Sequence, residues 1–296
     1  MTPPIELRAA DLHARIAVDG AELIGLRYRS HELLWHGDPA IWDRISPILF
    51  PVVGRTHRDS IRVGDQVHPM PMHGFARDCR FEVAAASASS CRLVLEDSAR
   101  TRVHYPYAFR LSLTYALDGR RLTVDGKLAN RGAGPLPASF GFHPGFRWPL
   151  EPGRPKTDYA IRFPDDTDAL VAARPHDGWL DRARTQTPLA GGALRLSDDV
   201  FRTGSIVFLS LASRWVEYGA PDAPLALRIA FDGLPQLAVW SRPPGDFICV
   251  EPWHGHPEPI DSAGPFVDKP GLAAVPPGET QTFRMTIEVV DDRSAG

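Results

Sequence analysis

Apolar and polar residues alternate along many short stretches of this chain, and that alternation is the pattern of half-buried β-strands. It is clearest over Phe109 to Leu117 and over Leu122 to Leu128, and the Asp118-Gly119 pair between these runs favours a tight hairpin turn. Shorter runs of the same character cover residues 21–28, 91–95, 205–211, 225–231, 237–240, 247–250 and 280–290. Many short strands separated by turn residues predict an all-β sandwich or barrel.

Helical signals are weak by comparison. No stretch keeps a 3.6-residue apolar period, and we expect only single helical turns at residues 38–42 and 198–201. The 25 glycines and 29 prolines fit this picture, because proline interrupts the helical hydrogen-bond ladder and glycine weakens it. Residues 163–192 are polar and rich in turn formers, so we expect an insertion or a rim loop there. No repeat or linker divides the chain, and we expect a single domain over residues 1–296.

Composition and charge narrow the class of protein. Hydrophobic residues make up 43% of the chain, enough for a sizeable core, and the formal net charge of −3 argues against a nucleic-acid partner. The longest apolar run, residues 45–53, is too short to span a bilayer, and residues 1–18 lack the basic start and the apolar stretch of a targeting segment. The three cysteines form no CxxC motif, which favours a reducing compartment. We therefore expect a cytoplasmic protein that acts on a small molecule, with no nucleic-acid or membrane partner; no feature of the sequence predicts its oligomeric state.

Functional side chains are concentrated in four short segments that are rich in glycine and proline. They are FPVVGR (residues 50–55), HPMPMHGFARD (68–78), FGFHPGF (140–146) and CVEPWHG (249–255). His143 and Glu251 each follow an apolar run and precede a proline, which places both at predicted strand ends. Imidazole is suited to proton donation near neutral pH, and burial of a carboxylate raises its pKa and makes it a better base. The same two residues also fit a buried core histidine and a carboxylate that pairs with an arginine.

Other residues of this kind suit a sugar. Arg55 and His73 can donate hydrogen bonds to hydroxyl groups, although each can equally satisfy backbone carbonyls or carboxylates. The apolar face of a pyranose packs well on an aromatic ring. The candidates for such an aromatic wall are Trp240, Trp253, Phe142 and Phe75. Without further information, most of these aromatic side chains would be expected in the core.

Taken in order, the four segments resemble the aldose 1-epimerase (galactose mutarotase) family, in its LacX-like branch. The stretch YPYAFRLSLTYALDG (residues 105–119) and the segment LAVWS (237–241) are also similar to that branch, and the resemblance extends from about Ala14 to Val290. It implies a large antiparallel β-sandwich of the galactose mutarotase type, a supersandwich, with a sugar cleft on one sheet. It also implies a carbohydrate-binding isomerase that needs no metal and no organic cofactor.

The resemblance assigns roles to individual residues. The family's general base is a glutamate, which corresponds to Glu251, and its general acid is a histidine, which corresponds to His143. A second histidine and an arginine contact sugar hydroxyls, and these correspond to His73 and Arg55. The other residues counted as substrate-binding are Arg77, Phe142, Trp240 and Trp253. The implied reaction is the interconversion of the α and β anomers of a free hexose by acid–base ring opening.

Two further functions on the same fold stay open. A hexose-phosphate 1-epimerase, acting for example on glucose 6-phosphate, shares a similar HGFAR segment and needs cationic groups, which Arg55, Arg58 and Arg77 offer. A non-catalytic sugar-binding protein is the other, because Gly204 stands where related sequences tend to carry a substrate-contacting aspartate. Asp198 and Asp199 lie close to that position in the sequence.

A metal-dependent β-barrel enzyme is a third alternative. His254-Gly255-His256 has HxH spacing, which on a strand would direct both imidazoles to one face. Pro252 and Pro257 flank this triplet and favour a loop instead. We therefore expect these histidines to be loop or rim residues and expect no metal.

Overall fold

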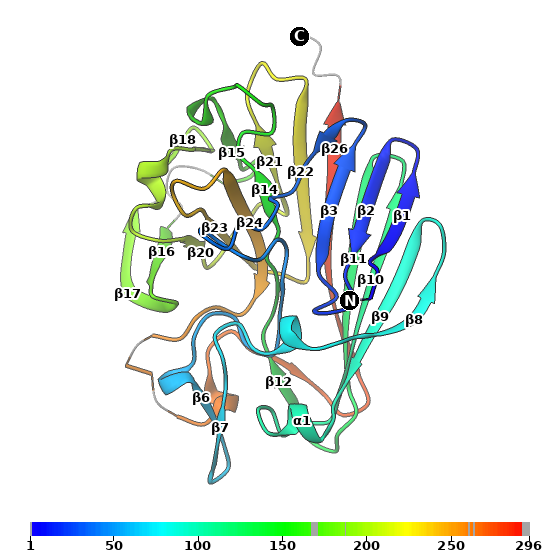
Figure 1. Ribbon diagram of the computed structural model, residues 1–296. Coiled ribbons are helices and arrows are strands. Elements are labelled where there is room, and N and C mark those ends of the chain that lie inside the picture. The colour runs from blue at the N-terminus through cyan, green and yellow to red at the C-terminus, as the bar shows by residue number, and fades with distance from the viewer. Residues whose placement is uncertain (1, 167–170, 187, 260, 263, 292–296) are drawn as a thin grey trace.

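Strands make up nearly all the regular structure of the protein, as the alternating pattern predicts. The structure is a computed structural model that describes residues 2–166, 171–186, 188–259, 261–262 and 264–291. Figure 1 shows its two large sheets, which form the two halves of the molecule. The predicted hairpin is confirmed, because Phe109–Asp118 (β10) and Arg121–Asn130 (β11) run antiparallel and Asp118 pairs with Arg121 beside the turn. The other predicted strands are also present, with ends that differ by a few residues.

The larger sheet has ten strands and contains this hairpin. Every second residue of β10 is buried from Phe109 to Leu117, so one face of the strand packs inward. In order across the sheet, the strands are β18 (Leu189–Ala190), β19 (Ala193–Arg195), β15 (Ala160–Arg162), β21 (Trp215–Gly219), β22 (Leu225–Asp232), β26 (Thr280–Asp291), β11, β10, β9 (Ser90–Glu96) and β8 (Glu82–Ala86).

The second large sheet has eight strands and carries several of the functional segments. Its strand β24 (Phe247–His254) is buried over almost its whole length, as expected for a strand covered on both faces. In order, the strands are β17 (Trp179–Gln186), β16 (Val171–His176), β20 (Ile206–Phe208), β23 (Gln236–Trp240), β24, β13 (Phe140–Phe142) and β5 (Ile48–Leu49), with β14 (Gly145–Arg147) also paired to β24.

The two large sheets pack face to face through aromatic side chains. Phe140 of β13 stacks on Phe283 of β26, with ring centroids 4.6 Å apart and ring planes at 10°. Gly126 of β11 makes room for this contact, because a Cβ atom there would lie 2.7 Å from the Phe140 ring. A contiguous cluster of buried apolar side chains runs through both sheets, so the strands that carry the functional segments rest on a closely packed support.

Smaller elements cover the edges and ends of these sheets. A four-stranded sheet packs on β10, and the hydroxyl of Tyr115 donates a 2.6 Å hydrogen bond to the carbonyl of Ala21. Its strands are β1 (Ile5–Ala9), β2 (Leu12–Ile16), β3 (Leu23–Tyr28) and β4 (His31–Glu32). Two strand pairs complete the β structure: β6 (Ser60–Val63) with β7 (Gln66–Pro69), and β12 (Leu136–Ala138) with β25 (Ala273–Val275).

The helical segments are all short. They are α1 (Ala99–Arg102), η1 (His57–Asp59), η2 (Ala76–Asp78), η3 (Lys156–Asp158), η4 (Asp198–Phe201) and η5 (Phe266–Asp268). The helical turn predicted at residues 198–201 is confirmed as η4, whereas residues 38–42 form a turn in which the Trp42 N–H donates to the Asp38 carbonyl at 2.7 Å. In the part of the chain that is described, no helix has the length and the apolar character needed to cross a bilayer.

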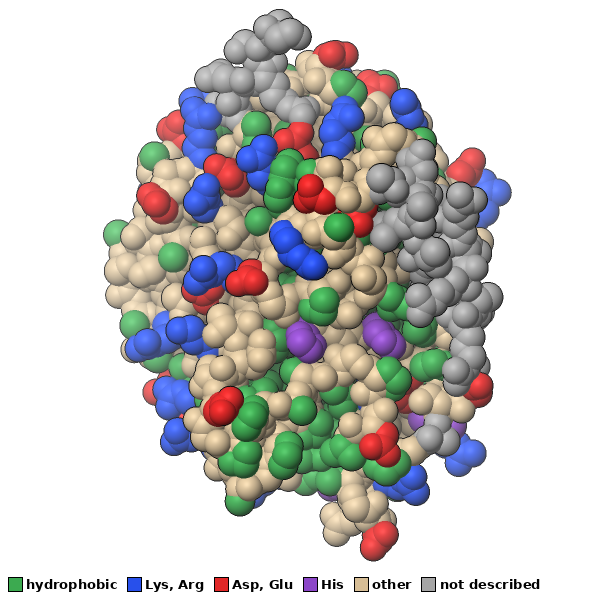
Figure 2. Space-filling view, turned by 180° about the vertical axis from the view of Figure 1, so that it is seen from behind, with side chains coloured by type: hydrophobic (Ala, Val, Ile, Leu, Met, Phe, Trp, Pro, Cys, Tyr) green, Lys and Arg blue, Asp and Glu red, His purple; other side chains and the backbone are tan. Residues whose placement is uncertain are grey.

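Charged side chains of both signs lie interspersed over the face seen in Figure 2, in keeping with the small net charge.

The prediction of a loop over residues 163–192 is wrong. Strands β16 and β17 form an antiparallel hairpin in this segment, and Ala172 of β16 pairs with Phe208 of β20, which joins the hairpin to the second large sheet. The turn residues Asp177 and Gly178 have φ angles of 49° and 83°, and an Asp-Gly pair is among the preferred sequences for such a turn. The sequence therefore contains a turn signal at Asp177-Gly178, although the polar composition of the segment favours a loop.

Candidate active site

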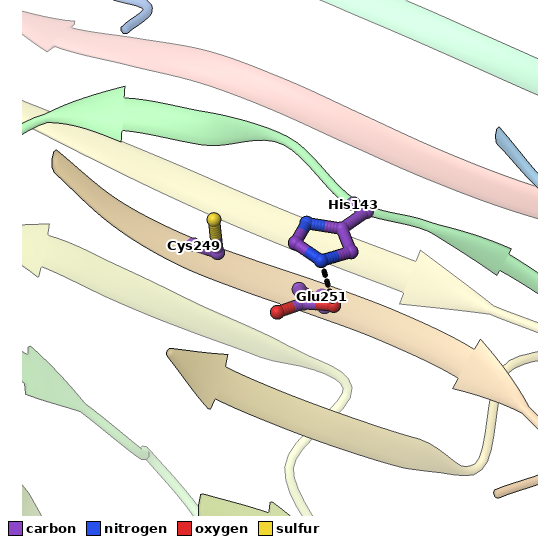
Figure 3. Close-up of side chains that lie close together, drawn as sticks. All are labelled: His143, Cys249 and Glu251. Atoms are coloured by element: carbon purple, nitrogen blue, oxygen red, sulfur yellow. Dashed lines mark ion pairs between the residues drawn. The ribbon is translucent and has the colours of Figure 1, made fainter. Parts of the chain in front are cut away.

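His143 and Glu251 are brought together by an interruption in one strand of the second large sheet. Strands β13 and β14 both pair with β24, Gly141 opposite Trp253 and Gly145 opposite Cys249. The residues between them, His143 and Pro144, therefore lie beside the stretch of β24 that contains Glu251. His143 projects from this break toward the carboxylate (Figure 3), and its Nε2 atom lies 3.1 Å from Glu251 Oε2.

The pair lines a cavity of about 1060 Å³, slightly above the roughly 300–1,000 Å³ that is usual for small-molecule sites. Most residues predicted for the site reach this cavity from separate parts of the chain. They are His143, Glu251, Arg55, His73, Arg77, Trp240 and Trp253. The fold thus brings residues of the four sequence segments to one cavity, as a single sugar site requires.

Two of the aromatic candidates are core residues instead. Phe142 has 1% of its surface exposed and packs edge-on against Phe140, with ring centroids 5.0 Å apart. Side chains two residues apart on a strand share a face, so Phe142 faces the interior together with Phe140. The prediction of Phe142 as a substrate-binding residue is therefore wrong. Phe75 is likewise buried, and its ring lies 6.1 Å from that of Phe50 in an aromatic cluster of the core.

Burial governs the protonation of His143 and Glu251. The Glu251 side chain is 2% exposed and that of His143 is 8% exposed. Loss of water raises the pKa of Glu251 well above its usual value and lowers the pKa of His143 to about 3. At neutral pH the imidazole of His143 is therefore uncharged, and burial shifts Glu251 toward its protonated form. A protonated Glu251 beside a neutral His143 becomes an ionised Glu251 beside a protonated His143 when one proton crosses the 3.1 Å contact.

His73 is fixed as a neutral hydrogen-bond donor beside this pair. Burial, together with the charge of nearby cationic groups, lowers the pKa of His73 well below its usual value. The backbone N–H of Gly54 donates to His73 Nδ1 at 3.1 Å, so the ring proton resides on Nε2. The rings of His73 and His143 meet edge to face, with centroids 5.7 Å apart. His73 can thus offer an Nε2–H to a ligand next to His143.

Arg55 is held in the cavity wall by three hydrogen bonds. Its Nη1 atom donates to both carboxylate oxygens of Asp59 at 2.6 and 2.8 Å, and its Nε atom donates to the carbonyl of Asp177 at 2.9 Å. Arg77 is anchored in a similar way, because its Nη2 atom donates to the carbonyl of Met72 at 2.8 Å. Such anchored guanidinium groups lose little further freedom when they bind a ligand. Arg58, the third cationic candidate for a phosphate, lies outside the cavity lining.

Trp42 is a site residue that the sequence analysis missed. Its ring stacks on that of His143 with centroids 5.0 Å apart and planes at 29°, while Trp240 meets the same imidazole edge-on at 5.8 Å. Trp42 lies in a turn that belongs to none of the four segments, so no local signal marks it. The hairpin turn Asp177–Trp179 also lines the cavity. It was not expected there, because residues 163–192 were predicted to form a loop.

The position of Gly204 is confirmed as a cavity position. Gly204 lines the cavity together with Asp198 and Asp199 of η4. Asp199 is paired with Arg202, and Asp198 accepts a 3.4 Å hydrogen bond from Lys156 Nζ. Carboxylates close to Gly204 are therefore present, although both already have cationic partners. His254 and His256 of the HxH triplet do not line the cavity, and each Nδ1 lies within 3.0 Å of a backbone carbonyl.

Comparison with known proteins identifies the family of this chain. Residues 3–267 match the Aldose 1-epimerase family. The plasmid-encoded protein LacX of Lactococcus lactis subsp. lactis is 28% identical over 298 residues, which cover 97% of this chain and 99% of LacX.

Two solved structures share the whole fold. The galactose mutarotase related enzyme from Lactobacillus acidophilus superposes with a TM-score of 0.90 at 26% identity, with 98% of each chain covered. A galactose mutarotase-like protein from Lactobacillus casei gives a TM-score of 0.89 at 26% identity, with 97% of this chain and 99% of that chain covered. The resemblance seen in the four sequence segments is confirmed, and this chain belongs to the aldose 1-epimerase family.

Proposed function

We propose that this protein interconverts the α and β anomers of an aldose by acid–base ring opening. The observation that supports the proposal most strongly is the contact of 3.1 Å between His143 Nε2 and Glu251 Oε2 in the wall of a cavity that is large enough for a sugar. Membership of the aldose 1-epimerase family supports an isomerase of this general kind. A free hexose is the substrate that we propose.

Ring opening requires two proton transfers on one hemiacetal. Glu251 removes the proton from the C1 hydroxyl, His143 donates a proton to the ring oxygen, and the C1–O5 bond breaks. Rotation about the C1–C2 bond presents the other face of the carbonyl, and closure reverses both transfers. The C1 hydroxyl and the ring oxygen are attached to the same carbon atom, so two groups 3.1 Å apart can serve both.

Burial favours a protonated Glu251 and a neutral His143, so these roles require that the proton first pass to His143 across the 3.1 Å contact. Once that proton is on His143, a sugar in the cavity meets one proton acceptor and one proton donor at the same time. Trp42 stacks on the imidazole and keeps water from one of its faces, which strengthens the electrostatic interaction between donor, acceptor and sugar. Arg55, His73 and Arg77 surround the pair with hydrogen-bond donors for the remaining hydroxyls.

A hexose phosphate is a second candidate substrate, favoured by one specific observation. Arg242 lines the cavity, stacks over Trp240 at 5.6 Å from the ring centroid, and donates to the carbonyl of Ile41 at 2.9 Å. No carboxylate partner of Arg242 is found among the described side chains, whereas Arg55 and Arg202 both have one. A guanidinium without a counter-charge at this wall can bind a phosphate.

A panel of free and 6-phosphorylated aldoses tests the proposal. We expect the protein to accelerate exchange between the anomeric proton signals of free glucose or galactose in NMR spectra, because each positioned acid or base contributes about 10²–10⁴-fold. A higher kcat/KM on the 6-phosphates would favour the second candidate. Sugar binding without any acceleration on any member of the panel would contradict the enzymatic function and support a non-catalytic sugar-binding protein.

Replacing Arg55 with methionine is expected to raise KM by about 10–100-fold and to leave kcat nearly unchanged, because a charged hydrogen bond to a hydroxyl is worth about 1.5–3 kcal/mol. Steady-state kinetics on the best sugar of the panel measures both constants. Arg58→Met is the matched control, since Arg58 is exposed and lies outside the cavity lining. Equal kinetics for the two variants would remove Arg55 from the substrate-binding residues.

A further inference from the structure

We infer that His143, Cys249 and Glu251 together form a binding site for a divalent cation of the zinc class. One ligand atom from each side chain, namely an imidazole nitrogen, the thiol sulfur and a carboxylate oxygen, lies within 4.8 Å of the other two. Figure 3 shows the three side chains gathered over the same stretch of β24. This binding goes beyond the proposed epimerase reaction, which uses His143 and Glu251 but leaves Cys249 without a role.

The backbone sets the three ligands in place. Cys249 and Glu251 are two residues apart on β24, so their side chains share one face of the strand. Gly145 pairs directly with Cys249, which holds the preceding His143 over the same face. Strand β24 thus supplies two of the ligands, and the short break between β13 and β14, both paired with β24, supplies the third.

His143 carries a buried polar atom that lacks a partner. Its Nδ1 atom has no hydrogen-bond partner among the described residues, whereas Nε2 lies 3.1 Å from Glu251 Oε2. An unsatisfied buried polar atom is costly in free energy. A cation that takes up lone pairs of the carboxylate and the imidazole removes part of that cost.

The donor set matches the preference of zinc. Three protein ligands from thiolate, imidazole and carboxylate, with a fourth position open, are typical of zinc sites that are accessible to solvent. Both His143 and Glu251 line the large cavity, so the cation has an entry path and a water molecule can occupy the fourth position.

Binding requires a small rearrangement and the loss of a proton. Tetrahedral zinc brings its ligand atoms to about 3.3–3.6 Å from one another, so the widest separation in this cluster shortens by about 1 Å as Cys249 or His143 rotates about its χ1 bond. The Cys249 thiol loses its proton to solvent as the sulfur–zinc bond forms, and Glu251 loses any proton that it carries. No electron is transferred in this step.

The bound cation occupies the lone pairs that proton transfer to and from a sugar would use. Zinc at this site is therefore expected to inhibit anomer exchange, an effect that rests on the proposed function, whereas the binding itself does not.

Titration of the full-length protein with Zn²⁺, in competition with a chromophoric chelator and in a non-thiol reductant, tests the binding directly. We expect one Zn²⁺ per chain, and with Co²⁺ in its place an absorption band of thiolate-to-metal charge transfer. Cys249→Ala should weaken Zn²⁺ binding by at least about 10–100-fold, the loss that is typical of even an outer-shell change at a metal site, and should abolish the cobalt band. The other two cysteines are also free and buried, so Cys79→Ser and Cys91→Ser are matched controls that should keep both signals.

The activity of the same proteins gives a second readout. Zn²⁺ should inhibit anomer exchange by the wild-type protein, a chelator should restore it, and Cys249→Ala should remain active and resistant to Zn²⁺. If the Cys249 variant does not fold, the cobalt spectrum of the wild-type protein still decides whether a thiolate ligates the metal. Equal Zn²⁺ affinity in Cys249→Ala and wild type, or a cobalt complex without the thiolate band, would overturn the inference. Zinc binding by a protein that shows no anomer exchange would retain the metal site and contradict the proposed function alone.

Discussion

Glutamine in place of Glu251 is expected to slow anomer exchange by about 10²–10⁴-fold, because the amide has the size of the carboxylate and cannot accept a proton from the C1 hydroxyl. The loss should appear in kcat, while the affinity for the sugar changes little, since Arg55, His73 and Arg77 still line the cavity. Polarimetry on fresh α-D-glucose or α-D-galactose measures the rate, and calorimetric titration measures the affinity. Glu288→Gln on β26 is the matched control, because Glu288 pairs with Arg121 in the other large sheet.

The same variant should change how stability depends on pH. The pKa of Glu251 is raised in the folded protein, so the folded state keeps this proton at pH values where the unfolded state has released it. Stability from this group is complete below the unfolded pKa of about 4.5 and is lost as pH rises through the folded pKa. The unfolding temperature of Glu251→Gln should therefore fall less than that of the wild type as the pH is raised. Near wild-type anomer exchange in this variant would remove Glu251 as the base.

Asparagine in place of His143 is the second large effect, with an expected loss of about 10²–10⁴-fold in kcat, because the side chain can no longer carry a proton to the ring oxygen. The loss in the double variant with Glu251→Gln should be smaller than the sum of the two single losses in free energy, since both residues act on one hemiacetal. His254→Asn is the matched control, because His254 lies at the end of β24 and contacts the carbonyl of Gly233.

His143 also leaves a signature at low pH. Its pKa is about 3 in the folded protein, below its usual 6.5, so the unfolded state binds a proton that the folded state rejects between these values. Stability from this group is therefore present above pH 6.5 and declines as pH falls toward 3. His143→Asn should show a smaller fall of the unfolding temperature over that range. Full activity in this variant would assign the acid to another group.

The strands of this protein were predictable because local pattern and tertiary packing agree. In β10 every second residue faces the core, so the alternation in the sequence is the alternation of burial. Residues 247–250 were predicted as a strand from their apolar run, but β24 continues to His254 through Pro252. The extension depends on pairing with β13 and β23, which no local pattern reveals.

The site was predictable only where its residues lie in recognisable segments. His143, Glu251, Arg55 and His73 each carry a polar group next to glycine or proline, and the fold brings all four to one cavity. Phe142 belongs to the same segment as His143, yet the two-residue period of β13 turns it toward the interior. Sequence proximity to a functional residue is therefore a poor guide to which face a strand residue occupies.

Trp42 could not have been found from the sequence. Its stacking on His143 arises because a turn outside the four segments folds against the end of β24, where Phe247 also packs on the Trp42 ring with centroids 5.2 Å apart. The hairpin at Asp177-Gly178, by contrast, carried a recognisable turn signal. Polar composition outweighed that signal because strands at the edge of a sheet need few apolar residues.

The central claim is that proton transfers by Glu251 and His143 open the sugar ring. The most direct test is magnetisation exchange between the α and β anomeric protons of the best substrate at equilibrium, measured at increasing protein concentration. The exchange rate should rise in proportion to wild-type protein and stay near the rate in buffer with Glu251→Gln, even though line broadening shows that the sugar still binds. An exchange rate that rises equally with both proteins would contradict the account.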